Sequence, residues 1–270
     1  MNTLYQQLAG ETLNDALARL EAGIKARPAD ADLRAAFVQF LTLSANWTRA
    51  LTQLKSWLAL KPQAKPTVTL LEQAIQGELQ RAQVMAGQAR PAMPETQWPW
   101  LTTLAAALNE EGERAQALRL EALEQAQATA GHIILENEET QAFDWLMDGD
   151  ARLGPVCETL VNGRYFWLPF NAIAEIRFQA PASVTDLVWR HALVRLTDGT
   201  EQVCQIPARY PFAADAPDAV KLGRTTEWHP LDESGTLYEG LGQKAWLSEQ
   251  SESPLLSLSL VTFATDGADE

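Results

Sequence analysis

The first 130 residues contain a helical pattern that returns after 34 residues, and this repeat restricts the first half of the chain to paired helices. Leu13, Leu17 and Leu20 share one helical face, and Pro28 ends the segment because proline cannot continue a helix. Four positions recur 34 residues later: Ala16, Leu17, Leu20 and Pro28 return as Ala50, Leu51, Leu54 and Pro62. Such a repeat is typical of tetratricopeptide hairpins. Chance similarity between two helical hairpins remains the alternative.

Further helices are expected up to about residue 128. The helical pattern extends from Leu4 to Ala128, and its later segments cover residues 67–86, 99–109 and 113–128. Residues 89–99 contain three prolines and are expected to form a loop that ends near Trp98. Two to three stacked hairpins would form a short superhelix. The concave surface of such a superhelix usually binds a peptide or a helix.

After Gly131 the pattern changes to strands and turns. Asn162-Gly163 and Asp198-Gly199 each separate two apolar segments, and both dipeptides favour the positive φ values of a type I′ hairpin turn. A helix is expected near residues 154–161. The predicted fold is therefore α+β, with a tetratricopeptide-like α-superhelix in residues 1–130. An acidic α+β domain with an antiparallel sheet, open or partly closed into a barrel, is expected in residues 131–270.

The charge of the chain is concentrated in its second half. The net charge is −14, with a balance of −1 in residues 1–130 and −13 in residues 131–270. Such a field repels phosphate backbones and anionic lipids, so nucleic acid and membrane surfaces are disfavoured as partners. No apolar run approaches the roughly 18–20 residues of a membrane span, and the first residues do not resemble a signal peptide.

The cysteine content favours a reducing compartment. Cys157 and Cys204 lie 47 positions apart and form no CxxC pair. They are expected to be buried thiols, and neither a disulfide nor a metal site is indicated. We therefore expect a cytoplasmic protein.

One group of carboxylates has the composition of a possible active site. Asp144, Asp148 and Asp150 precede Arg152 closely, and Glu158 follows. Closely spaced carboxylates can bind Mg²⁺ or Ca²⁺, and they can share protons in acid–base catalysis. The spacing does not match an EF-hand. Structural, partner-binding and metal or catalytic roles stay open, and the structural hypothesis has Asp150 and Arg152 fixing a tight turn.

Other catalytic motifs are not recognisable. The three histidines are scattered without the spacing of a zinc site, and no serine lies in a GxSxG motif. The segment Gly240–Gln243 lacks the third glycine and the lysine of phosphate-binding loops. The sequence therefore predicts no cofactor and no metal. The tryptophans of the second half are expected to pack in the core.

A series of segments in the second half resembles a known family. The segments, in order, are FDWLMDGDARLGPVCETLVNGRYFWLPF (143–170), DLVWRHA (186–192), IPARYP (206–211), RTTEW (224–228) and GLGQ (240–243). This series, together with the helical first half, is similar to the TagJ/ImpE/SciE family of accessory proteins of the bacterial type VI secretion system. The resemblance implies a non-enzymatic adaptor that associates with the small subunit of the contractile sheath. Through this subunit it would be linked to the AAA+ ATPase that disassembles contracted sheath.

The position of a partner-binding groove is not fixed by the sequence. An amphipathic helix of the sheath subunit would bury its apolar face in such a groove. The candidates are the C-terminal aromatic segments and the concave helical surface, with the residues Phe37, Phe40, Trp47 and Trp57. Two other functions remain as alternatives: a metal-dependent hydrolase that uses Asp144, Asp148 and Asp150, and a general repeat scaffold for an unrelated partner.

Overall fold

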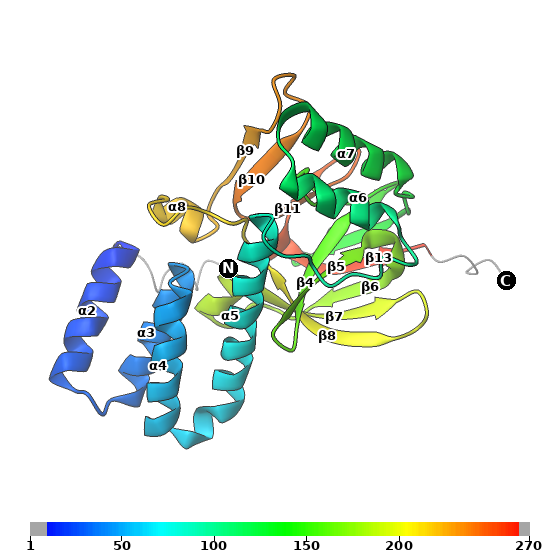
Figure 1. Ribbon diagram of the computed structural model, residues 1–270. Helices are drawn as coiled ribbons and strands as arrows, with labels where there is room; N and C mark the ends of the chain where they lie inside the picture. Colours follow the sequence, from blue (N-terminus) through cyan, green and yellow to red (C-terminus); the bar gives the residue numbers. More distant parts are fainter. Residues whose placement is uncertain (1–9, 265–270) are drawn as a thin grey trace.

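The computed structural model describes residues 10–264 and joins an arm of helices to a part built on β-sheets (Figure 1). The predicted start of the helical pattern at Leu4 and the last six residues lie outside this range. Four successive helices form the arm: α2 (Leu13–Ala26), α3 (Ala31–Leu43), α4 (Trp47–Leu60) and α5 (Lys65–Met85). Antiparallel strands follow from Gly131, so the predicted α+β fold class is confirmed.

The helices of the arm begin and end where the local sequence indicates. The side chains of Thr12 and Asp30 accept hydrogen bonds from the backbone N–H groups of the first turns of α2 and α3. The repeated alanines, Ala16 and Ala50, are both buried, which allows neighbouring helices to approach closely. The arm therefore consists of two stacked hairpins, α2 with α3 and α4 with α5.

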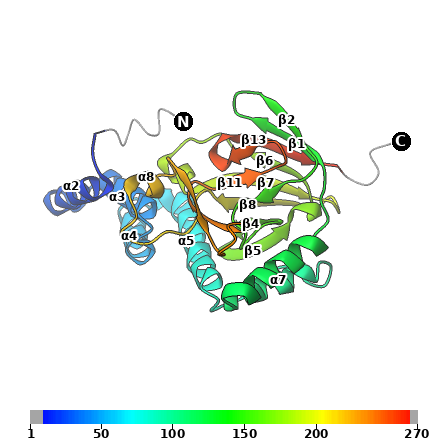
Figure 2. The same cartoon turned by 90° about the horizontal axis from the view of Figure 1, so that it is seen from above.

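A third helical hairpin does not extend the arm. It consists of α6 (Trp100–Ala106) and α7 (Gly112–Gln125), joined by the short helix η2 (Ala107–Asn109). Figure 2 shows α7 beside strand β5 (Arg164–Pro169), away from α2 and α3. Of the two or three stacked hairpins expected, two are therefore stacked in the described part of the chain.

The main sheet has eight antiparallel strands in the order β2-β1-β13-β6-β7-β8-β4-β5. The remaining bounds are β1 (Gly131–Leu135), β2 (Thr140–Phe143), β4 (Val156–Val161), β6 (Ile173–Phe178), β7 (Trp189–Leu196), β8 (Glu201–Pro207) and β13 (Leu258–Phe263). β2 and β5 are the two edges, so the sheet does not close into a complete barrel.

Two small sheets and several short helices complete the fold. One small sheet pairs β9 (Thr226–Pro230) with β10 (Tyr238–Gly242). The other contains β3 (Met147–Asp148), β11 (Ala245–Leu247) and β12 (Glu252–Pro254). The short helices are η1 (Pro62–Ala64), η3 (Phe170–Ala172), η4 (Val184–Leu187), α8 (Asp218–Lys221) and η5 (Leu255–Ser257).

The helix expected near residues 154–161 is absent, and strand β4 occupies this segment. Five of the six β4 residues are buried, the polar Glu158 and Thr159 among them, so the strand lacks the alternation of a half-exposed strand. A short run without such alternation cannot be assigned to helix or strand by periodicity alone. The error in the prediction therefore has a physical cause, which is burial of β4 on both faces.

The two predicted hairpins form, but with different turns. Asn162 (φ 51°) and Gly163 (φ 82°) both have positive φ between β4 and β5, as a type I′ turn requires. In the turn between β7 and β8 only Gly199 (φ 84°) has a positive φ. Here Leu196 N–H donates to Thr200 O across a longer loop. The type I′ prediction is therefore confirmed at the first turn and wrong at the second.

One continuous hydrophobic core extends from the arm into the main sheet. Helix α5 packs against β4 and β5, and Gly77 permits this approach. A Cβ atom at Gly77 would lie 2.8 Å from Cδ2 of Leu160. Cys157 and Cys204 are buried free thiols, as expected. Within residues 10–264, no helix combines the length and apolar character needed to cross a membrane.

The repeat packing predicts different costs for two leucines of α4. Leu54 is 1% exposed, whereas Leu60 is 39% exposed. Leu54→Ala is expected to lower the free energy of unfolding by about 2–5 kcal/mol, because it leaves a cavity between packed helices. Leu60→Ala is the control and should cost less than about 1 kcal/mol. Urea denaturation measures both, and equal losses would contradict this account of the arm.

Candidate functional site

The carboxylates singled out in the sequence do not all gather in one place. Asp144 is exposed, and its backbone N–H is held by Glu249. Asp150 is fully buried and binds Arg152 Nη2 at 2.6 Å, while Arg152 Nη1 also lies 2.8 Å from Glu239. The backbone carbonyl of Asp150 accepts from the N–H groups of Leu153 and Gly154. Asp150 and Arg152 thus fix the tight turn that leads into β4.

Asp148 instead belongs to a buried ionic network between the arm and the sheets. Lys244 Nζ lies 2.5 Å from Asp148 Oδ2 and 2.6 Å from Glu158 Oε2. On the other side, Glu158 accepts two hydrogen bonds from Arg81 of α5, from Nε at 2.7 Å and from Nη2 at 2.9 Å. All four side chains are nearly inaccessible to solvent. We call these four residues the buried ionic network.

Tyrosine and tryptophan side chains hold the network in place. The Tyr165 hydroxyl donates to Glu158 Oε1 at 2.5 Å and accepts from Trp167 Nε1 at 2.7 Å. The Tyr210 hydroxyl lies 2.9 Å from Asp148 Oδ1. These buried aromatic residues leave the carboxylates with protein partners and little access to water.

Burial and charge move the pKa values of the network in opposite directions. Burial raises the pKa of Asp148 to about 6, against the attraction of Lys244. Burial alone would also raise the pKa of Glu158, but Arg81 and Lys244 outweigh it and hold this pKa well below its ordinary value. Glu158 has two cationic partners, whereas Asp148 shares one with it, which accounts for the difference.

A second buried arginine connects the arm to the sheets without a carboxylate. Arg209 donates from Nη1 to Leu43 O at 2.7 Å and to Lys221 O, and from Nη2 to Thr42 O at 3.2 Å. Burial lowers the pKa of Arg209 to about 9. The hydrogen-bond partners of Arg209 are therefore backbone carbonyls of the arm and of α8.

The ion pairs of the buried carboxylates indicate a structural role for them. In the described range, no group of three or more His, Cys, Asp or Glu side chains is arranged to hold a metal ion. Sequence analysis missed Arg81 and Lys244 entirely. The only signal for Lys244 is its position beside the apolar segment AWL, where a buried lysine would need a carboxylate.

The aromatic residues proposed for partner binding contribute mostly to the core. Phe37 and Trp57 are buried. Phe40 and Trp47 are half-buried and pack against the same core, and the Trp47 ring lies 5.7 Å from that of Trp189. Among these four residues, only Phe40 and Trp47 have surface that a partner could reach in this conformation.

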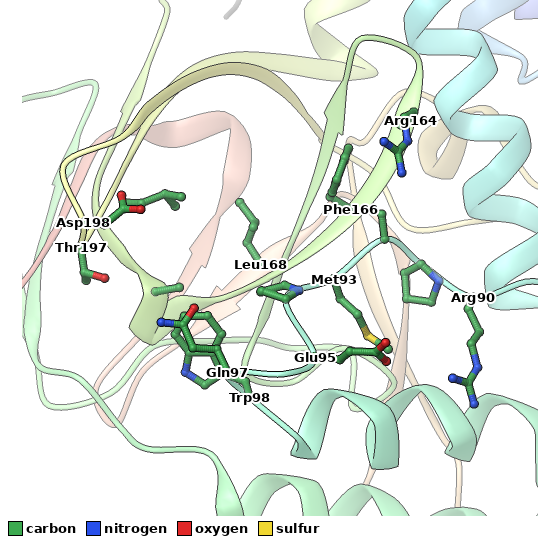
Figure 3. A pocket seen from close by; sticks show the side chains of 15 residues that line it. Arg90, Met93, Glu95, Gln97, Trp98, Arg164, Phe166, Leu168, Thr197 and Asp198 are labelled. Atoms are coloured by element: carbon green, nitrogen blue, oxygen red, sulfur yellow. The ribbon is translucent and has the colours of Figure 1, made fainter.

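An apolar groove lies beside β5, the edge strand of the main sheet. The proline-rich loop runs along this edge: Ala92 N–H donates to Tyr165 O at 3.2 Å, and Trp167 N–H donates to Ala92 O at 2.9 Å. The space between the loop, β5 and the β7–β8 turn has a volume of about 690 Å³. Its walls include Met93, Trp98, Phe166, Leu168 and Leu196 (Figure 3). We call this space the β5 groove.

Met93, Trp98, Phe166, Leu168 and Leu196 are all half-buried. Each therefore packs against the protein on one side and leaves apolar surface open on the other. The groove combines residues 90–98, 164–168 and 196–198, each of which the sequence presents as an ordinary loop, strand or turn. No local pattern brings these three segments together, which explains why the sequence did not indicate the groove.

Two sequence comparisons and one structural comparison relate this chain to known proteins. A sequence model of the ImpE protein family matches residues 140–262. The type VI secretion system accessory component TagJ of Pseudomonas aeruginosa is 38% identical over 256 residues, which cover 93% of this chain and 87% of TagJ. The crystal structure of protein VPA1032 from Vibrio parahaemolyticus is similar with a TM-score of 0.84 and 27% identity, over 96% of each chain.

Loss of the central carboxylate of the network should be costly. Glu158→Gln removes the negative charge between Arg81 and Lys244 and is expected to lower the free energy of unfolding by about 3–5 kcal/mol. Glu175→Gln is the matched control, because Glu175 pairs with the solvent-exposed Arg177 and Arg195. The control should cost less than about 1 kcal/mol. Similar losses in the two variants, measured by urea denaturation, would show that the network does not stabilise the fold.

The raised pKa of Asp148 predicts a pH dependence of stability. Between the unfolded value of 3.8 and the folded value of about 6, the native state binds a proton that the unfolded state does not. The free energy of unfolding should therefore rise, relative to Asp148→Asn, as the pH falls from 7 to 4, by at most about 3 kcal/mol. Denaturation of both proteins at several pH values measures this difference. A constant difference would contradict the raised pKa.

Proposed function

This chain belongs to the ImpE family, and from that premise we propose that it is an accessory adaptor of a type VI secretion system. It binds the small subunit of the contractile sheath, and through that subunit it connects to the AAA+ ATPase that disassembles contracted sheath. The family supports the accessory role, because the Pseudomonas aeruginosa relative, TagJ, carries that description. The link to the sheath subunit and the ATPase is our proposal.

The β5 groove is the observation that carries the binding proposal. An amphipathic helix that docks in a groove buries an apolar face made of residues spaced three and four apart. The groove offers half-buried apolar walls from three segments, and these side chains pack against the continuous core without belonging to its buried part. Docking there therefore requires no rearrangement of the core, whereas use of Phe37 or Trp57 would require their exposure.

We propose that the adaptor is not an enzyme and works in the cytoplasm. The buried carboxylates support a structural role, since Asp148, Asp150 and Glu158 are all bound to cationic side chains of the same chain. The net charge of −14 disfavours nucleic acid and anionic lipid surfaces as partners. A protein partner with an apolar helix face remains as the ligand that fits the groove.

Mutations in the groove test the binding proposal. The double variant Met93→Ala/Phe166→Ala should bind the cognate small sheath subunit about 10- to 100-fold more weakly, because it removes two apolar contacts at the centre of the site. Calorimetric titration of the purified proteins measures the affinity, and thermal denaturation checks that the variant is folded. The AAA+ ATPase should co-elute with the adaptor on a sizing column when the sheath subunit is present.

Phe40→Ala is the matched control, because Phe40 is another half-buried aromatic residue and lies on the helical arm. It should leave the affinity unchanged. Loss of binding in Phe40→Ala, with normal binding by the groove variant, would place the partner on the arm and refute the groove. The absence of any binding by the unmodified protein would exclude the small sheath subunit as its direct partner.

A further inference from the structure

Two arginines line one side of the β5 groove at separate positions. Figure 3 shows Arg90, from the proline-rich loop, and Arg164, from the start of β5, on the same side of the groove. Thr197 and Asp198 lie at the opposite end. Glu95 also lines the groove on the side of Arg90, so this side has two cations and one carboxylate, whereas the opposite end has Asp198.

Neither arginine forms an ion pair with a carboxylate in the described part of the chain. Both side chains are exposed. This is notable in a protein with 35 acidic and 21 basic residues, where carboxylates are plentiful. An external carboxylate could therefore pair with either guanidinium group without displacing an ion pair within the described part of the chain.

The position of Arg164 is set by an aromatic contact. Its guanidinium carbon lies 5.0 Å from the centre of the Phe166 ring, a cation–π contact with a residue that lines the groove. The stacked guanidinium is therefore held at the groove before a partner arrives. Planar guanidinium groups bind carboxylates through two parallel hydrogen bonds, which makes arginine well suited to this role.

A second cavity adjoins the groove on the side of the two arginines. It has a volume of about 280 Å³, and both arginines line it as well as the β5 groove. Its other walls include the side chains of Gln80 and Gln83 of α5. The two cavities thus share lining residues, Arg90, Pro91, Ala92 and Arg164.

We infer that the segment bound in the β5 groove carries carboxylate side chains at the end that lies over Arg90 and Arg164. This inference rests on the proposed function and adds the chemistry of the partner. The apolar face of the segment fills the groove between Met93, Phe166 and Leu168. Its acidic end lies over this side of the groove and pairs with the two arginines. The opposite end, which lies near Asp198, carries no acidic side chain.

Charge reversal tests the acidic end with the cognate small sheath subunit. Arg90→Glu and Arg164→Glu should each weaken binding about tenfold at low ionic strength, and the weakening should shrink at high salt because these contacts are solvent-accessible. Arg114→Glu is the matched control, since Arg114 is an exposed arginine of α7 outside both cavities. It should bind as the unmodified protein does. Unchanged or tighter binding by both groove variants would overturn the inference while leaving the groove intact.

Two designed peptides separate this inference from the identity of the partner. Both are amphipathic helices of about 15 residues with the same leucine face, and they differ only in three glutamates or three lysines at one end. Fluorescence anisotropy should show tighter binding of the glutamate peptide to the unmodified protein and a reversed preference in Arg90→Glu/Arg164→Glu. Equal binding of the two peptides by the unmodified protein would overturn the inference. If the sheath subunit does not bind but the glutamate peptide binds as expected, the result excludes the proposed partner and leaves this inference standing.

Discussion

The contact between Glu158 and its two cations joins the helical arm to the sheets, and much of the structure is arranged around it. Arg81 comes from α5, Glu158 from β4, and Lys244 from the segment that leads into β11. Burying such charges is costly, and their attraction offsets the cost only with good geometry and complete hydrogen bonding. Tyr165 supplies a further hydrogen bond to Glu158. The nearby aromatic residues therefore help to complete the hydrogen bonding that the buried charges need.

This junction also determines which surface is left for a partner. Because the arm is fixed to β4 and β5 by a continuous core, residues such as Phe37 and Trp57 are used for folding. The proline-rich loop leaves α5, pairs with edge strand β5 through Ala92, and forms one wall of the groove. The position of the β5 groove thus follows from the way α5 docks on the sheet.

Local patterns predicted much of the fold. The 34-residue repeat predicted the paired helices of the arm, and Asn162-Gly163 predicted a type I′ hairpin, because both depend on residues close in sequence. The same reasoning failed at β4, where burial on both faces removed the alternation that marks a strand. It also placed Asp144, Asp148 and Asp150 in one possible site. In the fold, Asp144 is exposed, Asp148 pairs with Lys244 and Asp150 pairs with Arg152.

The sequence by itself determined the helical repeat, the main hairpins, the acidic character of the second half and the resemblance to a family. These properties are fixed by composition, short-range periodicity and turn chemistry. Only the tertiary structure decided that Arg81 meets Glu158 across 77 positions and that Lys244 meets Asp148 across 96. It also decided that three unremarkable segments form the β5 groove. The physical reason is that such contacts depend on how α5 and the strands pack, and no short segment carries that information.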